Sequence, residues 1–515
     1  MRIISVLLAT VLGAGTLPTG ASPGAGGVVV RTDAGPVRGT ATRDLRIFRG
    51  IPYAAPPEGE LRWRSPQPPR PWSDVRDATR PGPPCAQAPN ELAGLPGSEA
   101  EDCLHVNVTT PRTRARPRPV IVYLHGGGFV SGAGDHYDAG LLALRGDVVV
   151  VTVNYRLGVL GFLGHPDLPG SGAFGLQDQQ AALHWVRRNA TAFGGDPARV
   201  TLAGESAGAL STCAHLTAPT SKGLFHRAIA LSGSCGVRWL KNGLGRGSPE
   251  ATTWAPPAEA HALARLYTAQ LGCDTVDCLR RLPVSGLLAN PLAPVLARPM
   301  YGSPVLPENP ETALAAGRFH RVPVMNGHTR DEHRLLTAAL YAPLIDEQQY
   351  AELVTDTFGA DAPQVAGRYP LTRYTSPSEA WSAIMTDAGW ACPTLADNRA
   401  LAGRAPVYGF EFADRTAPWA GSTPPPFPLG AYHGSDLPYL FPDLALTPAQ
   451  KRLSLTMVGY WARFARTGDP NGPGLPYWAP FEPGGDTVQS LAPAPDGTKP
   501  VDVAAGHQCA AWLTR

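Results

Sequence analysis

A serine between two glycines is the clearest candidate nucleophile in the chain. Residues 204–208 read Gly-Glu-Ser-Ala-Gly, after the apolar run 200–203 and before residues 209–211, which suit the start of a helix. At such a strand-to-helix turn the serine backbone is strained, so a side chain two positions away on either side would clash. The strain exposes the hydroxyl, and the next N–H lies at the positive end of a helix. Five-residue motifs have a high false-positive rate, so the weight of this one depends on its surroundings.

The order of residues along the chain selects a candidate base. A serine hydroxyl becomes a strong nucleophile only when a histidine accepts its proton and a carboxylate orients that histidine. Around an elbow of this kind the chain order is serine, acid, histidine. Eight of the 13 histidines follow Ser206, and His433 fits best because residues 430–436 follow a late strand across a Pro/Gly-rich loop. His507, near the C-terminus, is expected at the surface or in packing.

The orienting acid should lie in the loop after the strand-like run 322–326. Asp331 and Glu332 are the only pair of carboxylates in that loop, which spans residues 327–333. Both side chains have the required chemistry, and residue types alone do not choose between them. The alternative for either residue is a solvated charge on a loop.

A run of glycines offers backbone N–H groups near the same place. The continuous apolar run 119–124 predicts a buried strand, and it leads into residues 125–128, which read His-Gly-Gly-Gly. Consecutive glycines let N–H groups approach a ligand closely and point the same way. A flexible loop is the alternative. Ahead of a nucleophile elbow, however, such a run matches a loop that stabilises an oxyanion.

These residues need a scaffold that brings them together, and the apolar pattern predicts one. Residues 176–193 carry apolar side chains at helical spacing, between strand-like runs. Strands are expected near residues 28–30, 37–39, 106–108, 119–124, 147–154, 200–203, 228–232, 322–327 and 407–412, and a closing helix at 453–467. Strand, helix and strand in succession favour a parallel α/β sheet. Residues 236–320 and 340–405 are helical and loop-rich, and we interpret them as insertions that cap the site.

The composition excludes several classes of protein. Hydrophobic residues make up 43% of the chain and charged residues 17%, which favours a packed core over disorder. The formal net charge is only +2, so the chain carries no electrostatic footprint for nucleic acid or an anionic membrane. The cysteines and histidines lack the spacing of a metal site. Nothing in the residue types indicates an oligomeric state.

The N-terminus predicts export. Residues 1–21 contain a positive start, a short apolar run and small residues before a cleavage site after Ala21, as in a signal peptide. The apolar run is short for a membrane span, and no later run is long enough, so we expect no stable membrane insertion. Residues 22–515 are expected to form a single secreted domain. Eight cysteines in an exported chain suggest disulfides.

Taken together, these stretches resemble the type-B carboxylesterase family, the α/β-hydrolases that include cholinesterases and some fungal lipases. The most specific similarities are residues 193–208 and 101–104, and the likeness covers nearly the whole mature chain. Further matches lie at residues 48–54, 154–156 and 433–439. The resemblance implies an α/β-hydrolase fold, with a central, mostly parallel twisted sheet, helices on both faces and large insertions over the site.

The resemblance also assigns roles to single residues. It implies Glu332 as the acid, because relatives carry Asp-Glu-Gly where this chain has His333 in place of the glycine. The oxyanion hole would consist of the N–H groups of Gly127, Gly128 and Ala207. The family's disulfides correspond to Cys85–Cys103, Cys273–Cys278 and Cys392–Cys509. Cys213 and Cys235 are then left over, and whether they pair stays open.

These assignments predict a serine carboxylic-ester hydrolase that works through an acyl-enzyme and needs no metal or cofactor. The expected substrates are small to medium soluble esters. The resemblance places the choline-binding tryptophan of cholinesterases in the first disulfide loop. Here residues 86–102 of that loop hold no aromatic side chain for a cation–π site, which disfavours a cholinesterase. A lipase is the alternative for longer esters. The resemblance implies that the same loop would then be an apolar lid, as in fungal lipases, but here it has only Leu92 and Leu95 as large apolar residues. A non-catalytic binding protein of this fold would lack the triad. Residues 236–240, with Trp239, follow the next strand and could line the pocket.

Overall fold

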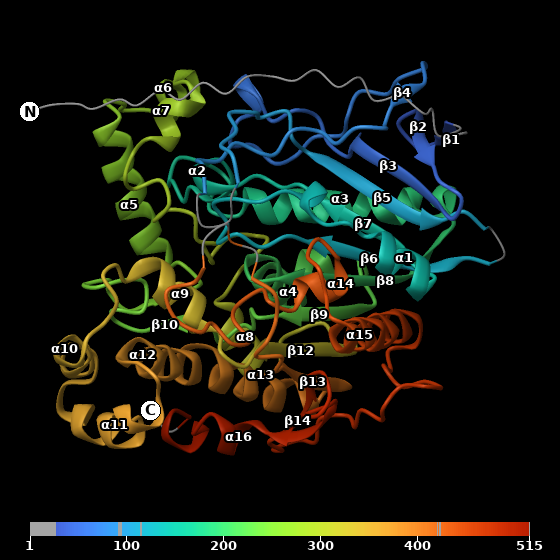
Figure 1. Ribbon diagram of the computed structural model, residues 1–515. Coiled ribbons are helices and arrows are strands. Elements are labelled where there is room, and N and C mark those ends of the chain that lie inside the picture. Colours follow the sequence, from blue (N-terminus) through green and yellow to red (C-terminus); the bar gives the residue numbers. More distant parts are fainter. Residues whose placement is uncertain (1–26, 91–94, 114–115, 420, 422–423, 514–515) are drawn as a thin grey trace, which may run out of the picture.

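The fold is known from a computed structural model that describes residues 27–90, 95–113, 116–419, 421 and 424–513. The predicted signal peptide and Leu92 lie outside the described residues. In the described part of the chain, thirteen strands form one mixed sheet (Figure 1). They are β1 Val28–Arg31, β2 Pro36–Ala41, β3 Leu45–Pro52, β4 Arg76–Asp77, β5 His105–Pro111, β6 Arg118–Leu124, β7 Val149–Val153, β8 Gly195–Glu205, β9 Arg227–Leu231, β12 Val324–Thr329, β13 Val407–Phe412, β14 Thr487–Leu491 and β15 Lys499–Asp502.

The helices lie on both faces of this sheet and at one end of it. They are α1 Gly140–Gly146, α2 Gly158–Phe162, α3 Phe174–Asn189, α4 Ala207–Thr217, α5 Pro257–Gln270, α6 Val276–Arg281, α7 Val284–Leu288, α8 Pro310–Ala315, α9 His333–Leu340, α10 Glu347–Phe358, α11 Ala362–Arg368, α12 Pro377–Thr386, α13 Cys392–Ala402, α14 Leu437–Leu440, α15 Pro448–Thr467 and α16 Val503–Gly506. A π-helical turn, Asp387–Ala391, joins α12 to α13. None of the described helices is both long and apolar enough to cross a membrane.

The centre of the sheet is parallel. Its strand order is β1-β2-β3-β5-β7-β6-β8-β9-β12-β13-β14-β15, with β4 paired to β2. From β7 to β14 each neighbouring pair runs parallel. The pairs from β1 through β2, β3 and β5 to β7 are antiparallel, as is β14–β15, whereas β4 runs parallel to β2. The mostly parallel α/β sheet expected from the sequence is therefore confirmed. The carboxyl ends of β6, β8 and β12 consequently meet at one edge of the sheet.

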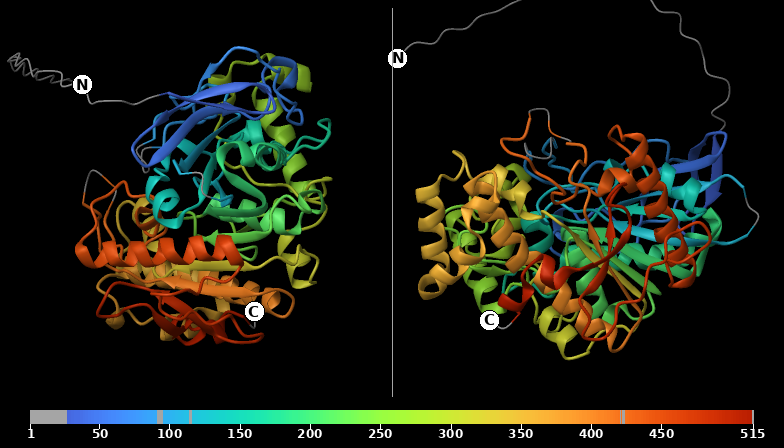
Figure 2. Two further views of the ribbon diagram at one scale, coloured as in Figure 1. Left: turned by 90° about the vertical axis from the view of Figure 1, so that its right-hand side faces the viewer. Right: turned by 60° about the horizontal axis from the view of Figure 1, so that its bottom comes forward.

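Strand β6 shows why the sheet is covered on both sides. Val120 and Val122 pack into a cluster with side chains from α3, α4 and α13. Ile121 and Tyr123, which point the other way, pack with side chains from α1, α14 and α15. A strand buried on both faces must be apolar at every position, which explains the continuous run seen in the sequence. Figure 2 (left) shows α15 lying across its face of the sheet.

Helix α15 illustrates how local sequence sets element bounds. Thr447 and Gln450 form a capping box at its start, with Pro448 in the first turn. Gly468 ends the helix in the left-handed region, with φ 84°. The helix thus begins five residues before the predicted segment 453–467, because its first turn is specified by these capping residues and not by apolar periodicity.

The inserted segments contain more than the helices expected from the sequence. Residues 236–320 include a two-stranded sheet of β10 (Arg238–Trp239) and β11 (Ala251–Thr252), where no clear strands were predicted. Helices α5–α7 and α9–α12 gather at one side of the sheet, on the left in Figure 1. This placement agrees with their interpretation as capping insertions.

All eight cysteines lie in the described part of the chain, and four disulfides pair them. Three are the bonds implied by the resemblance: Cys85–Cys103, Cys273–Cys278 and Cys392–Cys509. The fourth joins Cys213 of α4 to Cys235 after β9, the pairing that the sequence left open. This bond ties the helix behind the candidate nucleophile to the loop that leads to Trp239.

Candidate active site

The candidate nucleophile sits on a strained turn between β8 and α4. Ser206 has φ 54° and ψ −121°, a conformation that side chains rarely adopt. A Cβ on Gly204 would lie 2.3 Å from the backbone oxygen of Gly208, and one on Gly208 would lie 2.0 Å from the oxygen of Leu124. The N–H of Ser206 donates to Leu231 O of β9 at 2.9 Å, which fixes the turn. Both glycines of the motif are therefore required by close backbone approach.

Glu332 and His433 form a buried acid–base pair. His433 Nδ1 donates to Glu332 Oε2 at 2.6 Å, and Glu332 Oε1 accepts the N–H of Thr329 at 2.8 Å. The Glu332 side chain is fully buried. Burial raises the pKa of Glu332, but the interactions with His433 outweigh this effect and hold that pKa below its usual value. The carboxylate is thus ionised and fixes the imidazole with a proton on Nδ1.

The carboxylate of Asp331, the other candidate acid, contacts Arg415 and the backbone of Ala431 instead of the imidazole. Its oxygens accept two hydrogen bonds from Arg415, at 2.9 and 3.0 Å. Its Oδ2 also accepts the N–H of Ala431 at 3.0 Å, while its own N–H donates to Ala431 O at 2.9 Å. Asp331 therefore holds the loop that carries His433, and Glu332 is the carboxylate that contacts the imidazole.

The second nitrogen of His433 faces a third carboxylate. Nε2 lies 3.3 Å from Oε1 of Glu205, the residue that precedes Ser206 in the sequence. In the described part of the chain, the Ser206 hydroxyl makes no hydrogen bond to His433. The predicted hydrogen bond between nucleophile and base is therefore absent from this structure. Burial lowers the pKa of His433, but Glu332 and Glu205 outweigh it and raise that pKa to about 9. Burial raises the pKa of Glu205 to about 7.

An aromatic side chain packs against the ring of His433. The Trp390 ring centre lies 4.9 Å from that of His433, and Trp239 packs edge-on against Trp390 at 5.0 Å. The partner of Trp390 Nε1 is Nδ1 of His333, at 3.3 Å. Nε2 of His333 lies 2.9 Å from the carbonyl oxygen of Gly243, so Nε2 carries the proton and Nδ1 accepts. Burial lowers the pKa of His333 to about 4, which keeps this ring neutral.

The glycine run lies against the elbow, as an oxyanion site requires. Gly127 and Gly128 have φ 109° and 62°, and a Cβ on Gly127 would lie 2.1 Å from Ser131 O. A Cβ on Gly126 would lie 3.0 Å from the Cβ of Ser206. The N–H groups of Gly127, Gly128 and Ala207 donate to no acceptor among the described residues. They are therefore available to a ligand atom beside Ser206.

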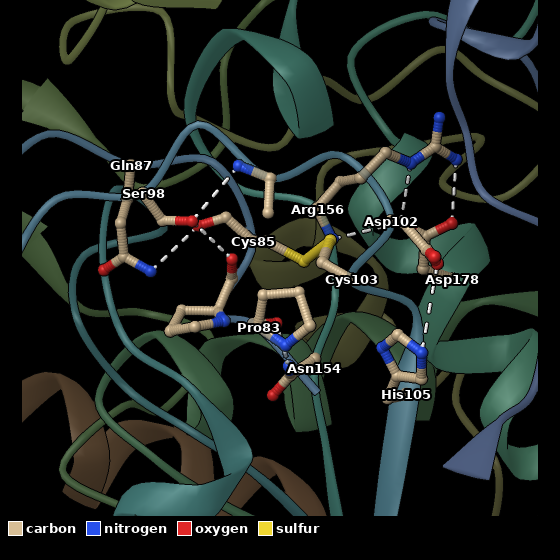
Figure 3. Close-up of a disulfide and its surroundings, with 12 residues drawn as sticks. Pro83, Cys85, Gln87, Ser98, Asp102, Cys103, His105, Asn154, Arg156 and Asp178 are labelled. Atoms are coloured by element: carbon tan, nitrogen blue, oxygen red, sulfur yellow. Dashed lines mark hydrogen bonds and ion pairs between the residues drawn. A yellow bond between two sulfur atoms is a disulfide. The ribbon is translucent and has the colours of Figure 1, made fainter. Parts of the chain in front are cut away.

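The loop closed by the disulfide Cys85–Cys103 packs against the segment that follows the glycine run. Figure 3 shows Cys85–Cys103 with Gln87 on one side and the Arg156–Asp178 ion pair on the other. Gln87 Nε2 donates to Cys85 O at 2.9 Å and to Gly132 O at 3.1 Å, and its Oε1 accepts the N–H of Gly132 at 2.9 Å. The base of the loop is thus fastened to the residues that follow the glycine run.

Three features of the structure are not marked by any local pattern in the sequence. Glu205 lies inside the nucleophile motif, so the sequence shows that it is next to Ser206. Its contact with His433 could not be predicted from the sequence. Trp390 belongs to the π-helical turn of an insertion, and no local pattern marks it. His507 lies in the packed interior, where it contacts Glu411 and Asp387, and not at the surface.

The fold and the nucleophile elbow place the chain among the α/β-hydrolases, and comparison with known proteins specifies which group. The chain belongs to the Carboxylesterase family, whose sequence profile matches residues 27–512. It is a carboxylic ester hydrolase by membership of that family.

Individual relatives support the same assignment over most of the chain. The para-nitrobenzyl esterase of Bacillus subtilis (strain 168) is 36% identical over 467 residues, which cover 86% of this chain and 90% of the relative. The pyrethroid hydrolase Ces2e of Rattus norvegicus is 35% identical over 495 residues, covering 86% and 84%. A solved structure of a PNB esterase matches with a TM-score of 0.76 and 33% identity, covering 93% of this chain and 99% of that one.

Proposed function

We propose that the protein hydrolyses small to medium soluble esters through an acyl-enzyme on Ser206. The observation that carries this proposal is the buried Glu332–His433 pair, which lies at the carboxyl edge of the sheet where the strained Ser206 turn also lies. Nucleophile, base and acid thus come from the ends of β8 and β12 and from the loop after β13.

The mechanism follows from the positions of these groups. Ser206 Oγ turns toward His433 Nε2, transfers its proton there and attacks the ester carbonyl carbon. Glu332 stabilises the imidazolium that forms, without taking its proton. The N–H groups of Gly127, Gly128 and Ala207 bind the oxyanion, and each such donor typically contributes about 3 kcal/mol to the transition state. The imidazolium then protonates the leaving alcohol, and water activated by the same histidine releases the acid.

Two observations support the proposed substrate size. In the loop of residues 86–102, the large apolar residues are Leu92 and Leu95 and no residue is aromatic, which suits neither an apolar lid nor a choline site. The Trp390 ring packs against His433 and the Trp239 ring packs behind it against Trp390, so large side chains fill this side of the base.

The test is a set of variants assayed on p-nitrophenyl esters of graded acyl length. Ser206→Ala, Glu332→Gln and His433→Ala should each lose nearly all turnover while keeping the far-ultraviolet circular dichroism of the wild type. Asp331→Asn is the matched control for Glu332→Gln and should retain chemistry better, because Asp331 does not contact His433. Wild-type turnover by Ser206→Ala would refute the nucleophile. A sharp rise in rate above the solubility limit of a long-chain ester would favour a lipase.

We also propose that residues 1–21 are a signal peptide and that residues 22–515 are secreted as one domain. The pairing of all eight cysteines supports this view, because disulfides persist in oxidising compartments. N-terminal sequencing of the protein from the medium of expressing cells should begin at Ser22. A start at Met1 on protein retained in the cell would contradict the proposal.

A further inference from the structure

Three residues of metal-ligating type converge in the interior, outside the candidate triad. His328, Glu411 and His507 each offer one ligand atom, and these atoms lie within 4.8 Å of one another. None of the three residues is more than 4% exposed. We propose that they bind one divalent transition-metal cation, Zn²⁺ being the best fit, and that this ion fastens the C-terminal segment to the sheet.

The backbone brings the three ligands together from distant parts of the chain. His328 of β12 and Glu411 of β13 are direct neighbours in the parallel register of the two strands. His507 follows α16, and the disulfide Cys392–Cys509 holds the chain two residues further on. Two ligands therefore stand on the rigid sheet, and the third is held in place by a covalent bond nearby.

The geometry is close to that of a tetrahedral site. His507 Nε2 lies 2.6 Å and His328 Nε2 lies 3.8 Å from the same oxygen, Glu411 Oε2. The two imidazole ring centres are 5.3 Å apart, with the planes at 75°. Two imidazoles bound through Nε2 to tetrahedral Zn²⁺ at about 2.0–2.1 Å have ring centres about 5 Å apart. To admit the ion, the contact between His507 and Glu411 must open and the separation between His328 and Glu411 must shorten slightly.

The surrounding contacts are those that orient metal ligands in proteins. His507 Nδ1 donates to Asp387 Oδ1 at 2.6 Å, which directs Nε2 toward the cluster. The second oxygen of Glu411 accepts from Arg330 at 3.2 Å. The hydroxyl of Tyr369 donates to Asp387 Oδ2 at 2.7 Å. A carboxylate on the far nitrogen of a ligating histidine, itself hydrogen-bonded, is the usual outer arrangement.

His328 is the observation that points to a ligand. Both of its ring nitrogens are buried and have no hydrogen-bond partner among the described residues. A buried imidazole with an unpaired N–H and an unpaired lone pair loses its hydration without compensation. A cation beside Nε2 would satisfy the lone pair.

The alternative is a hydrogen-bonded cluster without an ion, in which protonated His507 bridges Asp387 and Glu411. With Arg330 on the second oxygen of Glu411, that arrangement balances charge, but it leaves His328 without any role. With an ion bound, the proton that His507 shares with Glu411 passes to solvent, and Nε2 becomes a ligand. The two explanations therefore differ in whether His328 matters.

The experiment measures zinc in full-length protein produced in zinc-supplemented medium and dialysed against metal-free buffer. Because the site is buried, we expect the ion to enter during folding and to survive dialysis. The wild type should retain about one Zn²⁺ per chain. His328→Gln, which breaks no hydrogen bond seen in the structure, should retain at least tenfold less, whereas the exposed control His184→Gln should match the wild type.

Two results would overturn the proposal. The first is wild-type protein that retains less than a tenth of a Zn²⁺ per chain, which needs no variant to interpret. The second is a His328→Gln protein that retains as much zinc as the wild type. A denaturation and refolding experiment gives a second readout: the wild-type melting temperature should be higher after refolding with Zn²⁺ than with a chelator, and that difference should vanish in His328→Gln.

Discussion

The contact between Trp390 and His433 leads to a prediction about the catalytic base. His433 must become an imidazolium when it accepts the proton of Ser206. The centres of the two rings lie 4.9 Å apart with their planes at 49°, and Trp390 is 3% exposed, so aromatic surface lies next to that cation away from water. Trp390→Leu keeps an apolar side chain there but removes the ring.

The size of the effect can be worked out from this contact. A cation over an indole is stabilised by about 1–2 kcal/mol when the pair is desolvated. Losing that stabilisation lowers kcat/KM by about 5- to 30-fold. It also lowers the pKa of His433 by about 0.7–1.5 units, because the cationic form becomes less stable. The acid limb of the kcat/KM profile should therefore move to lower pH.

The assay is hydrolysis of p-nitrophenyl butyrate between pH 5 and 10 by wild type, Trp390→Leu and Trp390→Phe. Phenylalanine keeps a weaker ring, so it should fall between the other two. His333→Gly, which removes the partner of Trp390 Nε1, should shift the profile in the same direction by a smaller amount. If Trp390→Leu lost stability to urea but kept both the rate and the pH midpoint of the wild type, the aromatic contact would be packing alone and our reasoning would be wrong.

Three further predictions concern the turn, a disulfide and the pH profile. Gly127→Ala should lower kcat by about 10²–10³-fold in a steady-state assay, because the new Cβ would lie 2.1 Å from a backbone oxygen and displace an oxyanion donor. Replacing Cys213 and Cys235 together by serine should lower the urea-derived free energy of unfolding by about 3 kcal/mol, as expected for a separation of 22 residues. Glu205→Gln should move the acid limb of the kcat/KM profile to lower pH, because the Glu205 carboxylate helps to raise the pKa of His433 to about 9 and the neutral imidazole is the base. An unmoved limb would show that this charge does not act on the base.

Much of the scaffold was predictable because its central strands are buried on both faces. The run 119–124 is apolar at every position since both faces of β6 are covered, and residues 176–193 match α3 with its 3₁₀ extension. The nucleophile turn was predictable for a steric reason, because Gly204 and Gly208 allow backbone contacts that exclude any side chain.

Other features depend on contacts that the local sequence does not encode. Asp331 and Glu332 are adjacent and chemically alike, and only the course of the backbone decides which one meets His433. Strands β14 and β15 were not predicted. Strand β15 is a short edge strand with Lys499 and Pro500 and no apolar alternation, so its local sequence does not indicate a strand. The position of His507 is set by partners 96 and 120 residues away, so its spacing in the sequence carries no trace of them.

The identity of the nucleophile is the central claim, and covalent labelling tests it most directly. Treatment with an organophosphate such as paraoxon, followed by peptide mapping, should place one diethylphosphoryl group per chain on Ser206, in step with loss of esterase activity. Ser206→Ala should remain unlabelled and inactive under the same conditions. A stoichiometric adduct on a different residue, or inactivation without any adduct on Ser206, would contradict the account.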